Sequence, residues 1–341
     1  GLAGSFLLLV IARMAVAAAA APAAPAALSL IADLYPPQRR ALAISIFTAA
    51  PTFAAIIAFS AGAWLVGNYG WRTSFIVVGV PALLTAALLA AFGREPLRGQ
   101  WDAGVAHPAP SSMRTTVAAL WADRTIRYLI LAGATATLGG TAFGMWNATF
   151  LVRSHGLSIQ HAGLLTGLIG GLSAGLGVMF AGWLADRLGS RRPGWRLAIP
   201  VIGHVLGALS LATYLFWPTG VGIVISGVPV PAAMLWCALN GFVTVWWMGP
   251  SFALLTTLAS PRNRAVALAL QPLLSTLFGV GFGPLAIGAL SDALQPQLGV
   301  EGLRYALLLG CATSVAAIVL LRRASFHLNG QHTTLLTSPA N

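Results

Sequence analysis

The sequence contains no lysine, and charged residues of any kind make up only 8% of its 341 residues. Soluble domains carry roughly 25% charged residues, whereas 57% of this chain is hydrophobic. So few charges could not cover a water-soluble globule of this length, and much of the surface must therefore face lipid. The composition excludes an ordinary soluble protein and indicates a membrane protein.

Cysteine is also scarce: Cys237 and Cys311 are the only two, and both lie in strongly apolar stretches. Their spacing matches no metal-binding or redox motif. We expect both to pack inside helices, and we expect no metal site and no bound cofactor.

The apolar beginning of the chain lacks the charge pattern of a secretory signal. A signal peptide carries its positive charge before the apolar run. Here Arg13 lies inside the run, and Arg39 and Arg40 follow it. We therefore expect a membrane helix at this position.

Nine apolar runs are long enough to cross a membrane as helices, since a hydrocarbon layer of about 30 Å takes about 20 helical residues. Strands of a membrane barrel would alternate in polarity, which these runs do not. The predicted fold class is thus an all-α polytopic membrane protein, in which each lipid-facing backbone satisfies its own hydrogen bonds. The predicted spans are 4–31, 41–67, 73–93, 126–151, 160–184, 196–217, 231–258, 265–291 and 303–321.

The basic residues fix a predicted orientation. When the loops are assigned alternately to the two sides, 15 arginines fall on one side and three on the other. This asymmetry predicts that the arginine-rich loops and the C-terminus are cytoplasmic, in a bacterial inner membrane. It also argues against a nucleic-acid partner despite the net charge of +12, because the charges are spread over short loops beside membrane ends. The richer side holds Arg39, Arg40, Arg94, Arg98, Arg114, Arg124, Arg127, Arg187, Arg191, Arg192, Arg196, Arg262, Arg264, Arg322 and Arg323, and the other holds Arg72, Arg153 and Arg304.

A polar stretch rich in proline and glycine divides the predicted spans into three before it and six after it. We interpret it as a cytoplasmic linker, with a short amphipathic helix on the membrane surface near 112–124. An odd number of spans that ends inside must begin outside, so we expect a truncated chain that lacks its first helices. The predicted parts are a partial three-helix bundle at 1–93, the linker at 94–125, a six-helix bundle at 126–323 and a cytoplasmic tail at 324–341.

The most specific motif is GWLADRLGSRR, which begins at Gly182. It resembles the loop signature G-x-x-x-D-R-x-G-x-R-R of the major facilitator superfamily, which follows the second helix of each half. The resemblance implies two six-helix bundles with family helices four to twelve present, and it implies that the loop latches one of two alternating states. A basic turn placed only by topology is the alternative interpretation. The motif residues are Gly182, Asp186, Arg187, Gly189, Arg191 and Arg192.

A second motif, GVGFGPLAIG, resembles the glycine-proline motif of the eleventh helix in that superfamily. Glycines allow two helices to approach closely, and proline bends a membrane helix where a neighbour covers the backbone. The corresponding first-half stretch keeps only Pro51 and Gly62, which argues against the antiporter branch. The packing residues are Gly279, Gly283, Pro284 and Gly288.

Arg13 and the stretch 22–41 resemble the family's fourth helix and the loop after it, and the whole pattern is similar to the spinster-like branch. An arginine this deep costs at least about 2.5 kcal/mol on insertion, so we expect it to face the bundle interior or a wet cavity. Snorkelling to the outer interface is the alternative. In the spinster-like pattern a glutamate used in proton coupling follows seven residues later, but here that position is Ala20. No acidic residue lies inside any predicted span, so coupling to a proton or sodium gradient stays open.

Polar and aromatic side chains within the predicted spans are candidates for a substrate or coupling site near the midplane between the halves. Each could instead be a packing or interface residue. His204 also titrates near neutral pH when unperturbed. Besides Arg13, the candidates are Trp146, Asn147, His204, Asn240, Trp246, Trp247, Gln271 and Ser275.

The leading hypothesis is a monomeric secondary transporter that works by alternating access, with membrane lipids around it and an anionic amphiphile such as a lysolipid as substrate. A symporter of sugar acids or organic anions and a drug exporter of the same superfamily are alternatives. A membrane enzyme would need a cluster of acids, histidines or metal ligands, and no such cluster occurs. A non-transporting membrane fragment is the third class, because three helices cannot enclose a cavity as six do.

Overall fold

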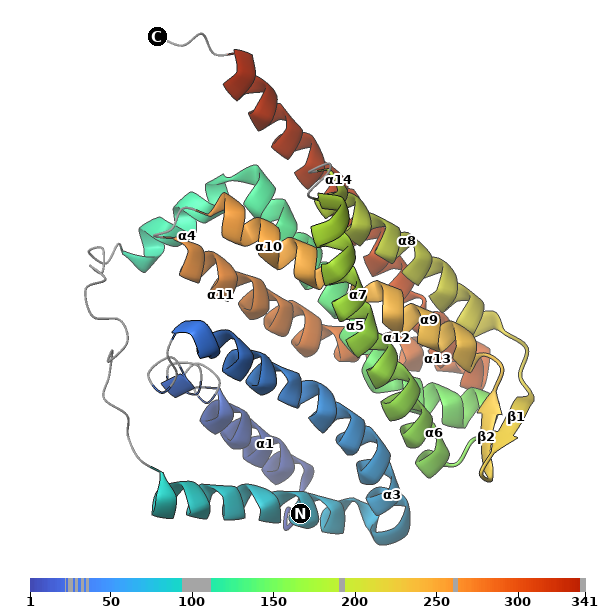
Figure 1. Ribbon diagram of the computed structural model, residues 1–341. Coiled ribbons are helices and arrows are strands. Elements are labelled where there is room, and N and C mark those ends of the chain that lie inside the picture. The colour runs from blue at the N-terminus through green and yellow to red at the C-terminus, as the bar shows by residue number, and fades with distance from the viewer. Residues whose placement is uncertain are drawn as a thin grey trace. The chain divides into compact units, whose positions relative to one another are not determined.

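The computed structural model describes residues 1–21, 23, 27, 30–31, 34, 37–93, 112–189, 194–259 and 263–337. The chain divides into two compact units, Gly1–Pro108 and Ala109–Asn341. Both are helical (Figure 1), as the apolar runs predict.

The first unit contains α1 (Phe6–Ala20) and the long helix α3 (Pro37–Phe92). Ser5 caps α1, because its hydroxyl accepts a hydrogen bond from the Leu8 N–H at 3.2 Å. Helix α3 bends at Gly70, whose φ of 77° and ψ of 165° suit only a residue without a side chain. The bend falls between the predicted spans 41–67 and 73–93.

The second unit is a bundle whose helices follow the predicted runs with several interruptions. Its elements are α4 (Met113–Ala122), α5 (Arg124–His155), α6 (Ile159–Leu165), the π-helical segment η1 (Thr166–Gly170), α7 (Gly171–Gly189), α8 (Trp195–Phe216), α9 (Met234–Thr244), α10 (Met248–Leu258), α11 (Arg264–Leu274), the π-helical segment η2 (Ser275–Phe282), α12 (Gly283–Leu298), the 3₁₀ turn η3 (Gly299–Glu301), α13 (Gly302–Leu307) and α14 (Leu309–Thr337). The helix predicted near 112–124 is present as α4.

Local sequence signals explain where α5 begins and ends. The Asp123 carboxylate accepts hydrogen bonds from the backbone N–H groups of Thr125 and Ile126 at 2.8 and 3.1 Å, so it caps the first turn. At the other end Gly156 adopts φ 67°, the left-handed conformation that closes many helices. Helix α5 therefore begins and ends at defined caps and runs for 32 residues.

Helix α5 is the element around which the second unit packs, since it contacts α14, η2 and α12. One apolar cluster includes the fully buried Phe150, Tyr214 and Leu307. Another, nearer the beginning of α5, includes Leu129 and Leu255. Polar groups in this bundle are thus enclosed by apolar side chains on several helices.

Six helical stretches within the described ranges are long and apolar enough to cross a membrane. One of them, Val266–Leu328, contains two of the predicted spans. Helix α1 is also apolar, but with 15 residues it is shorter than any of these six stretches. The count of nine spans remains a prediction. Helix α14 continues to Thr337, and Ala324 is fully buried, so the packed helix runs past the tail boundary predicted at 323.

A β-hairpin between α8 and α9 was not predicted. Strands β1 (Val221–Ile225) and β2 (Val228–Pro231) pair antiparallel across a two-residue turn. Ser226 and Gly227 in this turn both have positive φ, 49° and 81°, which matches the twist of paired strands. The Ser-Gly dipeptide between β-branched residues was the signal for it.

Candidate functional site

The candidate polar residues of the second unit fall into three separate groups rather than one pocket. Asn147 and Trp146 lie towards one end of α5, and Gln271 lies at the junction of α11 and η2. His204 and Asn240 line one cavity together. The residues of each group form hydrogen bonds with a different set of residues.

Asn147 is the centre of a buried hydrogen-bonded network. The Tyr214 hydroxyl donates to Asn147 Oδ1 at 2.6 Å, and the Asn147 amide donates to Thr166 Oγ1 at 3.3 Å and to Cys237 Sγ at 3.6 Å. Asn147 is 1% exposed and Tyr214 is fully buried. The network therefore links α5, α8, η1 and α9 to one another through buried side-chain hydrogen bonds.

Trp146 and Thr141 serve the irregular backbone of η2 and α12. The Trp146 indole N–H donates to the Pro284 carbonyl at 2.9 Å, and the Thr141 hydroxyl lies 3.1 Å from the Gly279 carbonyl. The Gly279 carbonyl also accepts the backbone N–H of Gly283, so the Thr141 contact is additional to the helical hydrogen bond. Side-chain donors from α5 therefore link this helix to η2 and α12.

Glycines bring η2 and α12 against α5. A Cβ on Gly279 would lie 2.7 Å from Thr137 Cγ2, and one on Gly283 would lie 2.7 Å from the Leu138 carbonyl oxygen. At Gly288 it would lie 3.1 Å from the Trp146 ring. A larger residue at Gly279 or Gly283 would therefore force the two helices apart, and one at Gly288 would require the Trp146 ring to shift.

Gln271 is fully buried beside Gly133, where any side chain would meet the glutamine amide and Trp247. Its Nε2 lies 3.4 Å from Ser275 Oγ, and its Oε1 has no partner. An unsatisfied buried oxygen costs about 1–3 kcal/mol, so the Gln271 carbonyl oxygen is a hydrogen-bond acceptor that lacks a donor from the protein.

Trp246 belongs to an aromatic cluster. Its ring centroid lies 5.4 Å from that of Phe180 and 5.7 Å from that of Phe242. The Phe180 and Phe242 centroids are 5.3 Å apart. Such separations are those of favourable aromatic pairs, so the cluster joins α7 to α9 and to the Trp246 segment that follows it.

Four residues of the loop motif lie at the end of α7. A Cβ on Gly249 would lie 3.6 Å from the Gly182 Cα, so α10 passes close to α7 there. One on Gly189 would lie 3.0 Å from Arg196 Cγ. The Arg187 guanidinium lies 5.3 Å from the Trp183 ring centroid, and Asp186 precedes it on the last turns of the helix. Arg191 and Arg192 lie outside the described residues.

Arg13 lies on α1 in the first unit, with its guanidinium carbon 5.9 Å from the Phe75 ring centroid. The side chain is exposed, and Ala20 is the last residue of the same helix. No acidic residue occurs in α1 or α3. The contact with Phe75 joins the cation to an aromatic face of the kinked helix.

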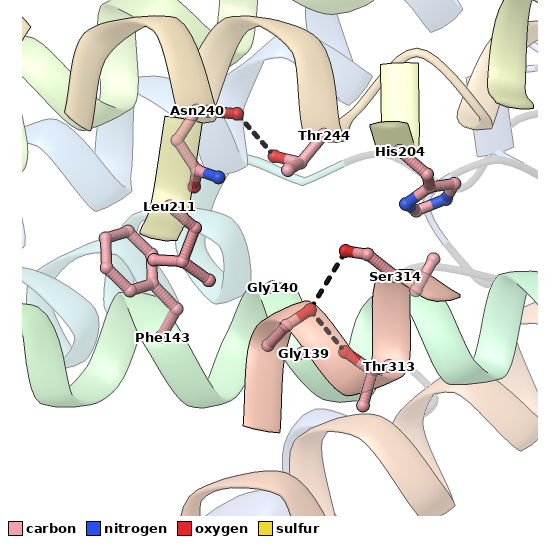
Figure 2. Close-up of a pocket in the computed structure, with 11 residues that line it drawn as sticks. Gly139, Gly140, Phe143, His204, Leu211, Asn240, Thr244, Thr313 and Ser314 are labelled. Carbon is pink, nitrogen blue, oxygen red and sulfur yellow. Dashed lines mark hydrogen bonds between the residues drawn. The ribbon is translucent and has the colours of Figure 1, made fainter. Parts of the chain in front are cut away.

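The cavity beside His204 is lined by α5, α8, α9 and α14 (Figure 2). His204 and Asn240 are each 3% exposed. The Asn240 amide donates to the Gly207 carbonyl at 2.9 Å. Figure 2 shows the imidazole and the hydroxyls of Thr313 and Ser314 around one opening.

Sequence reasoning missed three polar residues that the structure places with these groups. Tyr214 holds Asn147, and Thr313 and Ser314 line the His204 cavity. Adjacent hydroxyl residues in the apolar run 303–321 were a usable signal. Within the described ranges no three His, Cys, Asp or Glu side chains are arranged to hold a metal ion.

Comparison with known proteins identifies the family of this chain. The family model described as Major Facilitator Superfamily matches residues 1–271. An "MFS-type efflux pump" of Mycolicibacterium smegmatis is 30% identical over 88% of this chain and 67% of its own length. "Sphingosine-1-phosphate transporter SPNS2" of Danio rerio is 25% identical over 94% of this chain and 65% of its own length. The chain thus spans about two thirds of the length of these relatives.

A solved structure agrees with these sequence matches. It is a bacterial homologue of the human lysosomal transporter spinster in an inward-facing and occupied conformation, 26% identical, with a TM-score of 0.75. The match covers 99% of this chain and 80% of that one. The helix order described above is therefore shared with that protein over nearly the entire chain.

Proposed function

Because the chain belongs to the major facilitator superfamily, in its spinster-like branch, we propose that it is a secondary active transporter that works by alternating access. The observation that carries this proposal is the match to the bacterial spinster homologue, since 26% identity coincides with a TM-score of 0.75 over 99% of the chain. The names of the similar proteins also support transport rather than an enzymatic reaction.

The proposed movement uses the glycine contacts and irregular helices of the second unit. Segments η1 and η2 interrupt regular helices, and π-helical turns occur often at functional positions. The loop after α7, with Asp186, Arg187 and the two arginines beyond the described residues, is proposed as the cytoplasmic latch. The C-terminus would lie on the same side of an inner membrane.

The proposed substrate is an amphiphile with an apolar tail and an anionic head group. Arg13 supports this choice, because it is a cation in an apolar helix with an aromatic neighbour, and the described helices α1 and α3 contain no acidic residue. A guanidinium binds carboxylate and phosphate through paired hydrogen bonds. The aromatic cluster around Trp246 would suit an acyl chain or an aromatic solute.

The test uses purified protein in liposomes and a fluorescent lysophosphatidic acid as probe. We expect time-dependent movement of the probe that protein-free liposomes do not show. An uncharged monoacylglycerol with the same tail and label should move at least tenfold more slowly. Movement of ethidium or glucuronate but not of the lysolipid would favour the exporter or sugar-acid alternative, and no movement of any probe would refute transport.

Replacement of the proposed anion ligand tests its role separately. Arg13→Ala should lower the initial rate about tenfold to a hundredfold, because a charge-assisted hydrogen bond contributes roughly 1.5–3 kcal/mol. Arg72→Ala is the matched control, since Arg72 is also exposed in the first unit and lies 4.3 Å over the Trp71 ring. Equal transport rates for the two variants would show that Arg13 is an interfacial residue and does not bind the anionic head group.

A further inference from the structure

His204 is a buried ionisable side chain without a hydrogen-bond partner in the described part of the second unit. It lies within α8 with 3% exposure, and neither ring nitrogen has a hydrogen-bond partner in the protein. A neutral imidazole has one N–H donor and one acceptor nitrogen. Two unmet polar atoms are costly in an apolar bundle, so a missing partner is indicated.

The side chains across the cavity offer hydrogen-bond acceptors. The hydroxyls of Thr313 and Ser314 both donate to the Gly310 carbonyl, at 3.0 and 2.9 Å. The Thr244 hydroxyl donates to the Asn240 carbonyl at 2.7 Å. Each hydroxyl proton is therefore in use, while the oxygen lone pairs remain free to accept.

The cavity volume is about 20 Å³, and about 10–15 Å³ is enough for one water molecule. Close packing surrounds it. A Cβ on Gly207 would lie 2.6 Å from Thr244 Cγ2, and one on Gly310 would lie 2.6 Å from Leu211 Cδ2. The helices thus meet at glycines beside the cavity yet leave room within it for a single water molecule.

No charged side chain lines this cavity among the described residues. Helix α5 contributes Ala136, Gly139, Gly140 and Phe143; α8 contributes Leu211 besides the imidazole; α9 contributes Asn240 and Thr244; and α14 contributes Gly310, Thr313 and Ser314. The Cys311 thiol of α14 points instead to the Ala208 carbonyl, 3.4 Å away. His204 is therefore the one lining group that can gain or lose a proton.

We propose that this cavity is the proton-binding site of the transporter, with His204 as the group that carries the proton and a water molecule as its link to the hydroxyls. The proposal rests on the transport function proposed above and names its coupling ion. It places the coupling group in the second unit, on α8.

The proton transfer itself is simple. A hydronium ion gives a proton to the unprotonated ring nitrogen of His204, which forms an N–H bond and leaves a water molecule. The resulting imidazolium has two donors, which match the acceptor oxygens of the cavity. With no carboxylate nearby, the charge needs water around it. Proton uptake therefore belongs to a hydrated arrangement of α8 and α14, and the closed arrangement returns the proton to water.

Proton binding can be measured without a transport substrate. Purified protein in nanodiscs, labelled with ¹⁵N in histidine, is observed by NMR while the pH is lowered from 9 to 4. We expect one side-chain signal, missing in His204→Gln, that shows exchange with water in its neutral form and converts to imidazolium. A His204 signal that stays neutral at every pH at which the protein remains folded would overturn the proposal.

The coupling role is measured in liposomes with the fluorescent lysophosphatidic acid, with the membrane potential clamped at zero. One proton per solute predicts up to about tenfold accumulation per unit of pH gradient. His204→Gln should reduce the ratio to about one, and Thr313→Val, which keeps side-chain volume, should reduce it several-fold. His161→Gln is the control, because His161 lies at the start of α6 and does not line the cavity.

The outcomes separate the two proposals. If the unaltered protein moves no probe, the proposed transport function fails. If it moves the probe and His204→Gln accumulates it equally under the same pH gradient, the proton site fails while transport stands. Accumulation driven by a sodium gradient and indifferent to pH would also overturn the proton site.

Discussion

The contact between η2 and α5 allows a quantitative test at Gly279. A methyl group there would lie 2.7 Å from Thr137 Cγ2 and 3.0 Å from the Leu138 N atom. Ordinary contact begins near 3.4 Å. The Gly279→Ala methyl would thus overlap its nearest neighbour by roughly 0.7 Å, and overpacking of this kind costs about 1–3 kcal/mol.

The backbone also resists a simple adjustment at this position. The Thr141 hydroxyl donates to the Thr137 carbonyl at 2.7 Å and shares its proton with the Gly279 carbonyl at 3.1 Å, so moving η2 away from α5 weakens this shared contact. Interhelical hydrogen bonds in membranes contribute about 0.6 kcal/mol on average. Because alanine also gains about 1 kcal/mol of helix propensity over glycine, we expect the free energy of unfolding to fall by about 0.5–2.5 kcal/mol in Gly279→Ala.

The assay is equilibrium unfolding of the purified protein in mixed detergent and SDS micelles. Gly281→Ala is the matched control, because it lies in the same segment and its Cβ would meet only the Thr276 carbonyl, at 3.7 Å. Alanine is a better helix former than glycine by about 1 kcal/mol, so the control should be neutral or slightly stabilising. Equal stabilities of the two variants would refute the close packing of η2 on α5.

Two further changes test the buried network and the hairpin. Tyr214→Phe removes the 2.6 Å donor to Asn147 and should lower the free energy of unfolding in the same micelle assay by about 1 kcal/mol; the exposed Tyr305→Phe should not, and equal effects would contradict the network. Gly227→Ala places a side chain at φ 81°, costing about 1–2 kcal/mol, and should speed hydrogen exchange of the amides in β1 and β2. Gly220→Ala, which would meet nothing within 4 Å, should leave exchange unchanged, and an unchanged rate in both variants would rule out this turn.

The fold class followed from the sequence because lipid imposes a simple requirement. Uninterrupted apolar runs must become helices that satisfy their own backbone hydrogen bonds, and the structure is helical in both units. The family followed from short motifs such as the one at Gly182. The hairpin at β1 and β2 was not predicted, because its strands of five and four residues are apolar and lie next to the neighbouring membrane spans.

The contacts made by the buried polar residues could be identified only from the tertiary structure. In the sequence, His204, Asn240 and Asn147 cannot be distinguished, because each is a polar residue within an apolar run. Only the tertiary arrangement places the first two on one cavity and gives the third to Tyr214 and Thr166.

The sequence by itself determined that the chain enters a membrane as helices and belongs to a transporter family, because these properties depend on local hydrophobicity and on contiguous motifs. Tertiary structure decided which polar groups are satisfied and which are left facing a cavity. That decision depends on contacts between residues far apart in the chain, such as Asn147 with Tyr214 and Thr141 with Gly279, and no local pattern encodes the partner.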